Sequence, residues 1–118
     1  MPDRIIVYEK PTCTTCRKLM ALLREEGIEY EAVDYTITPI AREKLVELIE
    51  KMGITPRELL RTRHPAYKEL GLGSSGVSDD AILDAMAEHP ELVQRPIVER
   101  GPRAVLARPP EKVRELFD

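Results

Sequence analysis

The chain contains two cysteines, Cys13 and Cys16, which lie close together in the segment PTCTTCRKL. A C-x-x-C pair can be a redox dithiol, half of a metal site, or one reactive thiol with a buried neighbour. A cysteine at a helix N-terminus meets unpaired backbone N–H groups and the positive end of the helix dipole, which lower the pKa of its thiol. We expect Cys13 at such a position, where the same N–H groups can hold an oxyanion. Cys13 is therefore the predicted nucleophile.

The residues near Cys13 in sequence affect the state of its thiol. Lys10 and Arg17 bring positive charge close in sequence, and Arg17 lies one helical turn after Cys13 on the same side, so we expect both to stabilise the thiolate. Cys16 instead falls on the apolar stripe of the predicted helix, together with Leu19. Cys16 is either a resolving or redox partner of Cys13 or a residue of the core, and the sequence leaves both readings open.

Two arginines in the later part of the chain have an unusual setting. Arg95 and Arg108 each precede a proline at the edge of a predicted hairpin. The planar guanidinium group grips oxyanions with two parallel hydrogen bonds, which a lysine cannot do. Arginines that face a thiolate at a helix start indicate an anionic substrate.

Metal binding and membrane association are not expected. A structural zinc site needs about four ligands, and besides its cysteines the chain offers only His64 and His89, far downstream. No apolar run is long enough for a signal peptide or a membrane span. We therefore expect a cytoplasmic protein, and in that reducing compartment paired thiols are more often catalytic or metal-binding than structural.

The composition is that of an ordinary globular domain. Of 118 residues, 42% are hydrophobic and 33% are charged, with a net charge of −3 and an aromatic fraction of 4%. This length accommodates one domain with a modest core. The negative charge and the few aromatic residues argue against direct binding of nucleic acid.

The first third of the chain has the pattern of a βαβ unit. Residues 4–9 are short and rich in β-branched types, which predicts a buried strand. Residues 14–26 are good helix formers and end before Gly27. Residues 29–35 alternate between polar and apolar types and predict a second strand.

The middle of the chain is predicted to be helical, at about residues 38–93. An amphipathic stripe runs from Ala41 to Met52 and ends before Gly53. The segment TPRE, residues 55–58, is a capping box that starts a short helix, PAYKELGL indicates another short helical turn, and Ser78 caps a helix that runs to about Glu88.

Strand character returns in residues 95–109, where IVE and AVLA flank the turn RGP and predict a hairpin. A last helix follows Pro109, with Val113, Leu116 and Phe117 on its inner face. The order βαβ, helical block, ββα predicts the α/β class: a thioredoxin-like mixed β-sheet with an inserted helical block. We expect one domain over residues 1–118.

Four segments resemble the glutaredoxin-dependent arsenate reductase family, which also contains the Spx-type regulators and shares the thioredoxin-like fold. They are YEKPTCTTCR, ELLRTRHPAYKELGL, HPELVQRPIV and LARP, and they occur in order over nearly the whole chain. The resemblance implies that Cys13 attacks the oxyanion and that Arg61, Arg95 and Arg108 bind and polarise arsenate. It also implies glutathione as co-substrate, glutaredoxin as partner and no bound cofactor. In the thioredoxin-like fold a cis-proline faces the active cysteine, and Pro96 matches that place.

Two positions differ from the arsenate reductases that the chain resembles. Glu9 stands where they carry a histidine, and Cys16 stands where they usually carry a serine. The second thiol brings the chain towards two alternatives. One is an Spx-type redox sensor that binds RNA polymerase, and the other is a glutathione-dependent disulfide reductase without arsenate activity. The three arginines favour the arsenate reductase, because a sensor has no need to hold a free oxyanion.

Overall fold

The computed structural model describes residues 4–74 and 76–117. The chain forms two compact units. The first comprises Met1–Thr38 and Arg95–Asp118, and the second comprises Pro39–Gln94. The first unit contains the sheet and the two cysteines, and the second is helical.

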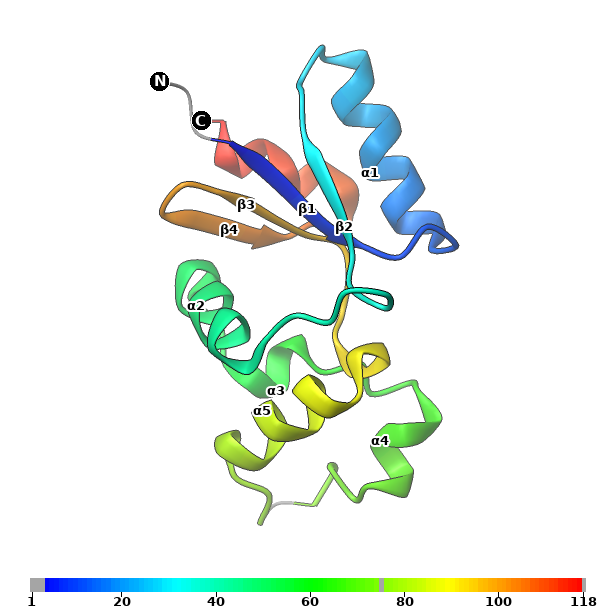
Figure 1. The fold of residues 1–118 in the computed structure, drawn as a ribbon, viewed down its shortest axis with the longest axis vertical. Coiled ribbons are helices and arrows are strands. Elements are labelled where there is room, and N and C mark those ends of the chain that lie inside the picture. The colour runs from blue at the N-terminus through cyan, green and yellow to red at the C-terminus, as the bar shows by residue number, and fades with distance from the viewer. Residues whose placement is uncertain (1–3, 75, 118) are drawn as a thin grey trace. The chain divides into compact units, whose positions relative to one another are not determined.

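The first unit is built on a four-stranded mixed sheet (Figure 1). The strands are β1 (Ile5–Glu9), β2 (Glu31–Asp34), β3 (Ile97–Arg100) and β4 (Arg103–Leu106), in the order β2-β1-β3-β4. Strand β1 pairs with β2 in parallel, and the pairs β1–β3 and β3–β4 are antiparallel. The predicted βαβ unit, the hairpin and the thioredoxin-like mixed sheet are confirmed.

Helix α1 (Thr14–Glu25) and the 3-10 helix η2 (Pro110–Leu116) cover one face of this sheet (Figure 1). Their apolar stripes make one core with the inward-facing residues of the sheet. The buried members of this core are Ile5, Val7, Leu19, Leu23, Val98, Val105, Ala107, Val113 and Leu116. Side chains alternate along a strand, so Tyr8 lies on the opposite face from Val7. On that face the Tyr8 hydroxyl donates a hydrogen bond to Glu99 Oε1 at 3.0 Å.

The sheet topology places the beginning of α1 beside the beginning of β3. Because β1 and β2 are parallel, Glu9 and Asp34 pair at the same edge of the sheet. Because β1 and β3 are antiparallel, Tyr8 pairs with Ile97, so the residues just before Ile97 reach this edge too. The edge therefore gathers the loop before α1, the segment after β2 and the segment before β3.

The second unit consists of α2 (Arg42–Met52), α3 (Pro56–Leu59), α4 (Pro65–Glu69), α5 (Asp79–Glu88) and the 3-10 helix η1 (Pro90–Leu92). The local signals act as expected. Thr55 forms a complete capping box, Ser78 caps α5, and Gly53 ends α2 in the left-handed region at φ 68°. The predicted helices of this block are confirmed, while the treatment of the whole chain as a single domain stays a prediction.

Some details differ from the sequence analysis. The final helix is a 3-10 helix, and its buried residues Val113 and Leu116 are spaced as its three-residue turn requires. Helix η1 was not predicted. The Arg95–Pro96 peptide bond is cis, as expected, and the Arg108–Pro109 bond is cis as well. In the part of the chain that the structure describes, no helix is long and apolar enough to cross a membrane.

Candidate active site

Cys13 is the residue at which α1 begins. Its backbone is extended, with φ −78° and ψ 123°, and its carbonyl oxygen accepts the hydrogen bond of Arg17 N at 3.1 Å. The preceding loop is closed by a hydrogen bond from Cys13 N to Lys10 O at 2.9 Å. The thiol thus lies where the first N–H groups of the helix have no helical partners. The expected helix-start position is confirmed.

The pKa of the Cys13 thiol is lower than that of an ordinary cysteine. Partial burial is the largest single influence and raises the pKa, but the backbone N–H and the S–H of Cys16 and the guanidinium of Arg95 together outweigh it. The Cys16 N–H does not form a cap hydrogen bond of good geometry with the sulfur. It therefore acts electrostatically, as the N-terminal N–H groups of a helix do. Cys13 is the activated thiol of the pair.

Cys16 has the opposite properties. Its side chain is fully buried on the same stripe of α1 as Leu19 and Leu23. Burial, and secondly the neighbouring Cys13 sulfur, raise the pKa of Cys16 to about 12, although the backbone of Lys10 and the charge of Arg95 act in the other direction. Cys16 therefore stays protonated and offers its S–H to the Cys13 sulfur. Its predicted place on the apolar stripe is confirmed, and its role as a resolving thiol stays a prediction.

Arg95 connects the two sides of the site. Its side chain is only 9% exposed. Its positive charge lowers the pKa of the Cys13 thiol, and Tyr35 and Cys13 in turn raise the pKa of the guanidinium, so the three groups interact. Burial lowers the pKa of the guanidinium, but Tyr35 and Cys13 raise it by more. The pKa of Arg95 is therefore above its ordinary value, and the group stays positively charged. Its Nε atom is buried without a hydrogen-bond partner. Among residues 4–74 and 76–117, this buried donor therefore has no acceptor.

Arg108 follows strand β4 and lies against the backbone of Arg95. Its Nη1 atom donates a hydrogen bond to the Arg95 carbonyl oxygen at 2.8 Å. A guanidinium has five N–H donors, and this bond uses one of them. The structure thus brings together Cys13, Arg95 and Arg108, three of the four residues that the sequence assigns to catalysis.

Arg61 lies in the second unit. Its backbone N–H donates to Leu92 O at 2.7 Å, and its Nη1 donates to Glu91 O at 3.1 Å. Both bonds attach it to η1, the element that leads along the chain to Arg95. The assignment of Arg61 to oxyanion binding rests on the resemblance alone.

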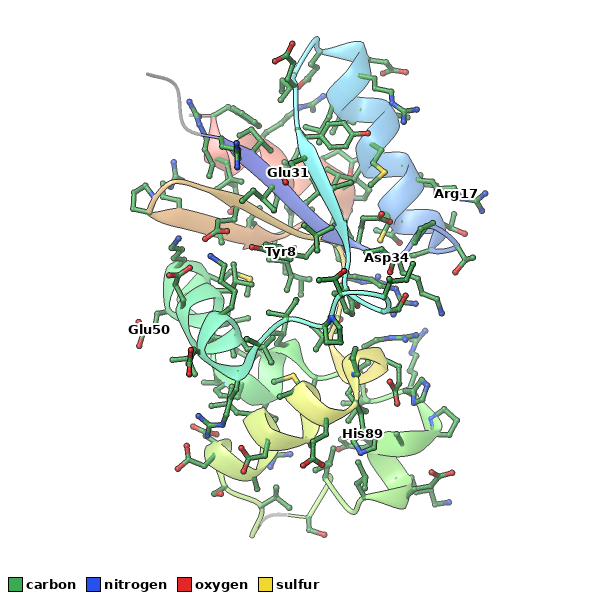
Figure 2. The ribbon with its side chains drawn as sticks, in the orientation of Figure 1. Tyr8, Arg17, Glu31, Asp34, Glu50 and His89 are labelled. Atoms are coloured by element: carbon green, nitrogen blue, oxygen red, sulfur yellow. The ribbon has the colours of Figure 1, made fainter. Side chains whose placement is uncertain are left out.

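The structure shows no direct contact of the Lys10 or Arg17 side chain, within its described residues, with the Cys13 sulfur. Arg17 is exposed on α1 and extends outward (Figure 2). Lys10 contributes backbone atoms: its carbonyl oxygen accepts from Cys13 N, and its backbone lowers the pKa of the Cys16 thiol. Stabilisation of the thiolate by these two side chains stays a prediction.

Glu9 is a buried carboxyl group at the same edge of the sheet. It is 5% exposed, and its Oε2 atom has no hydrogen-bond partner in the described part of the chain. Burial, with a smaller contribution from the charge of Asp34, raises the pKa of Glu9. Asp34 is the residue paired with it across β1 and β2 and lies at the end of β2 (Figure 2). Glu9 is therefore more easily kept neutral than an exposed glutamate.

Tyr35 is the site residue that the sequence analysis missed. It follows β2 directly, is fully buried, and raises the pKa of Arg95. The sequence analysis placed it at the end of the strand predicted over residues 29–35, where a tyrosine is usually read as part of the core. One signal could have identified Tyr35. It lies at the carboxyl end of a strand parallel to β1, and the carboxyl ends of parallel strands meet at one edge of the sheet, where sites form.

No group of three or more His, Cys, Asp or Glu side chains within residues 4–74 and 76–117 is arranged to hold a metal ion. Both cysteines are free thiols. The chemistry that these residues offer is that of a thiolate nucleophile beside fixed cationic donors.

Comparison with known proteins agrees with this geometry. Residues 8–116 match the family model described as the ArsC family. An arsenate reductase of Escherichia coli (strain K12) is 41% identical over 115 residues, a match that covers 98% of this chain and 82% of that protein. The Escherichia coli (strain K12) protein named Uncharacterized protein YfgD is 38% identical, with 98% of both chains covered. A solved structure titled Arsenate reductase from Vibrio cholerae superposes with a TM-score of 0.93 at 40% identity, covering 98% of both chains. The chain belongs to the ArsC family.

Proposed function

We propose that this protein is an arsenate reductase in which the Cys13 thiolate attacks the arsenic atom of arsenate. One observation carries the proposal. The buried guanidinium of Arg95 lowers the pKa of the Cys13 thiol, and its Nε donor has no acceptor among the residues that the structure describes. A buried N–H without a partner costs free energy, and an oxyanion oxygen beside the nucleophile would satisfy it. The arsenate reductases among the relatives support arsenate as that oxyanion.

The proposed first step forms a sulfur–arsenic bond. The Cys13 thiolate attacks arsenic, one oxygen of arsenate leaves as hydroxide and is protonated to water, and arsenic stays in its +5 state. Negative charge builds on the remaining oxygens during this step. Arg95, whose charge acts on the sulfur, and Arg108, which donates to the Arg95 carbonyl oxygen, supply positive charge for it.

The proposed second step reduces arsenic with an external thiol. Glutathione attacks the Cys13–arsenate adduct, two electrons pass to arsenic, and arsenite leaves while Cys13 and glutathione form a mixed disulfide. Glutaredoxin then removes the glutathione and restores the Cys13 thiol. The raised pKa of Cys16 and its burial favour an external thiol over Cys16 as the attacking group. No bound cofactor takes part, and the reaction belongs in a reducing cytoplasm.

A second candidate is a glutathione-dependent disulfide reductase without arsenate activity. The contact between the Cys16 S–H and the Cys13 sulfur favours it, because two thiols this close can form a disulfide with little rearrangement. The Spx-type regulator that binds RNA polymerase shares this feature. Neither alternative gives a reason for the unpartnered Nε atom of Arg95.

The deciding experiment measures arsenite formed from arsenate with glutathione and glutaredoxin. Wild type should turn over, and Cys13→Ser should fall to background. Arg61→Lys should lose activity if this arginine binds arsenate, whereas Arg57→Lys is the matched control. Arg57 also donates to backbone oxygens, of Leu72 at 3.0 Å and Val77 at 3.3 Å, but is not assigned to the site. A wild-type rate equal to that of Cys13→Ser would overturn the proposal, and binding of RNA polymerase by the same sample would then favour the regulator.

A further inference from the structure

We propose that Ile37 is a docking point for the thiol protein that regenerates Cys13. That protein is a glutaredoxin, and this identity rests on the proposed function. Ile37 and Cys13 belong to the same compact unit, and both lie at the edge of the sheet where the carboxyl ends of β1 and β2 meet. The inference therefore concerns the surface beside the nucleophile and does not involve the oxyanion.

Ile37 is far more exposed than a residue of its type usually is. It is 79% exposed, and the only other exposed large hydrophobic residue within residues 4–74 and 76–117 is Leu70, at 45%. A single exposed apolar side chain needs no explanation by itself. Ile37 differs because the backbone that presents it is fixed and because a reactive thiol lies at the same edge of the sheet.

Hydrogen bonds to Asp34 fix the turn that carries Ile37. The Asp34 carboxylate accepts from Thr36 N at 3.0 Å and from the Thr36 hydroxyl, which makes an Asx turn. The Asp34 carbonyl oxygen accepts from Ile37 N at 3.1 Å and from Thr38 N at 2.9 Å. Asp34 itself ends β2 and pairs with Glu9 of β1 (Figure 2). The Ile37 side chain is therefore presented to solvent from a backbone that is tied to the sheet.

The residues next to Cys13 in sequence give this surface a positive charge. Lys10 lies in the loop before α1, and Arg17 and Lys18 are exposed residues of the first two turns of that helix. The first turn contains no acidic residue. Interfaces have an apolar centre and a polar rim. A partner that fits here carries an apolar patch and acidic groups around its own cysteine.

The exchange reaction gives such a contact a use. The glutaredoxin thiolate attacks the glutathione sulfur of the mixed disulfide, the bond to Cys13 breaks, Cys13 leaves as a thiolate, and the glutathione becomes disulfide-bonded to glutaredoxin. The three sulfur atoms lie nearly in line during the attack, so the two proteins must approach in one orientation. An apolar contact beside the thiol favours that orientation, whereas a small thiol reagent needs no such contact.

The test measures this exchange directly in the full chain and needs no arsenate. In a Cys16→Ser background, which prevents an internal disulfide, oxidised glutathione converts Cys13 to its mixed disulfide. The second-order rate constant of its reduction is then measured with glutaredoxin and, separately, with dithiothreitol. Ile37→Ser should lower the glutaredoxin rate constant roughly three- to ten-fold and leave the dithiothreitol rate constant unchanged. Ile37→Val, which stays apolar, should keep most of the wild-type rate.

Leu70→Ser is the matched control. Leu70 is the other exposed large hydrophobic residue, but it follows α4 in the second unit, so its replacement should change neither rate constant. Lys18→Glu tests the charged rim. It should slow reduction by glutaredoxin at low salt, and the difference from wild type should shrink at high salt because salt screens exposed charges.

An unchanged glutaredoxin rate constant in folded Ile37→Ser would overturn the inference. An equal loss in Leu70→Ser, or an equal loss with dithiothreitol, would overturn it as well, and a wild-type rate for Lys18→Glu at low salt would overturn the assignment of the rim. If Ile37→Ser does not fold, Ile37→Gln is measured against the same criteria. A wild type that does not reduce arsenate would overturn the proposed function but not this result, because the exchange at Cys13 is measured without arsenate.

Discussion

The Nη1 atom of Arg108 donates a hydrogen bond to the carbonyl oxygen of Arg95 at 2.8 Å. The side chain of one predicted oxyanion-binding arginine therefore fixes the backbone of the other. The segment after β4 and the segment before β3 are joined at the edge of the sheet where Cys13 lies. Substitutions at Arg108 should for this reason affect more than one donor.

Arg108→Lys should lower kcat/KM for arsenate roughly 10–100-fold, because lysine keeps the charge but not the planar set of donors that can bond a carbonyl and an oxyanion together. The control is Arg103→Lys. Arg103 also lies at an end of β4, but its guanidinium donates to the carbonyl oxygen of Glu115. Equal rates for Arg108→Lys and Arg103→Lys would contradict the prediction, and steady-state arsenite formation measures both.

Cys13 should react with iodoacetamide well before Cys16. The Cys13 thiol is partly exposed and its pKa is lowered, whereas Cys16 is buried and its pKa is about 12. Peptide mass spectrometry after brief labelling near neutral pH measures the ratio. Preferential modification of Cys16 in the folded protein would reverse the assignment of nucleophile.

Cys16→Ser should keep arsenate reduction near the wild-type rate when glutathione and glutaredoxin are supplied. The serine hydroxyl can still donate to the Cys13 sulfur, and an external thiol resolves the adduct. Cys16→Ala should be slower by a small factor, because it removes the donor and so raises the pKa of Cys13. If folded Cys16→Ser loses as much activity as Cys13→Ser, the protein is an internal dithiol enzyme.

Glu9→Gln should stabilise the protein at neutral pH. The pKa of Glu9 is raised in the folded state, so folding favours the protonated form. Its contribution to stability is complete below the pKa of the unfolded chain, about 4.3, and is lost as pH rises through the folded value. The gain in the free energy of unfolding should be about 1 kcal/mol at pH 7 and should vanish near pH 3.

Denaturant unfolding at the two pH values measures this difference. Glu31→Gln is the control, because Glu31 is an exposed residue of β2 whose carboxylate pairs with Arg4 at 3.3 Å, and its replacement should change stability little at either pH. The same stability for Glu9→Gln and wild type at pH 7 would show that Glu9 ionises there without cost.

The sequence alone was enough to place the starts of the α-helices and the strands, although not the 3-10 helix η1. Cys13 at the beginning of α1, the capping box of Thr55 and the left-handed Gly53 each depend on interactions within a few residues. The burial of Cys16 also followed from the helical period of its neighbours. Capping interactions and helical periodicity depend only on residues close in sequence, so they do not change with the tertiary structure. They could therefore be predicted from the sequence.

The environment of the thiol was decided by tertiary structure. Arg95 comes to the edge where Cys13 lies because β3 pairs with β1, and Tyr35 comes to the same edge because β2 pairs with β1 on its other side. The sequence marked Arg95 through its proline neighbour but contained no local signal for Tyr35 or for the burial of Glu9. Hydrogen bonds between residues distant in sequence exist only once the strand order is fixed, so composition and spacing cannot reveal them. The nucleophile was therefore determined locally, and the charges and donors that activate it were determined by the sheet.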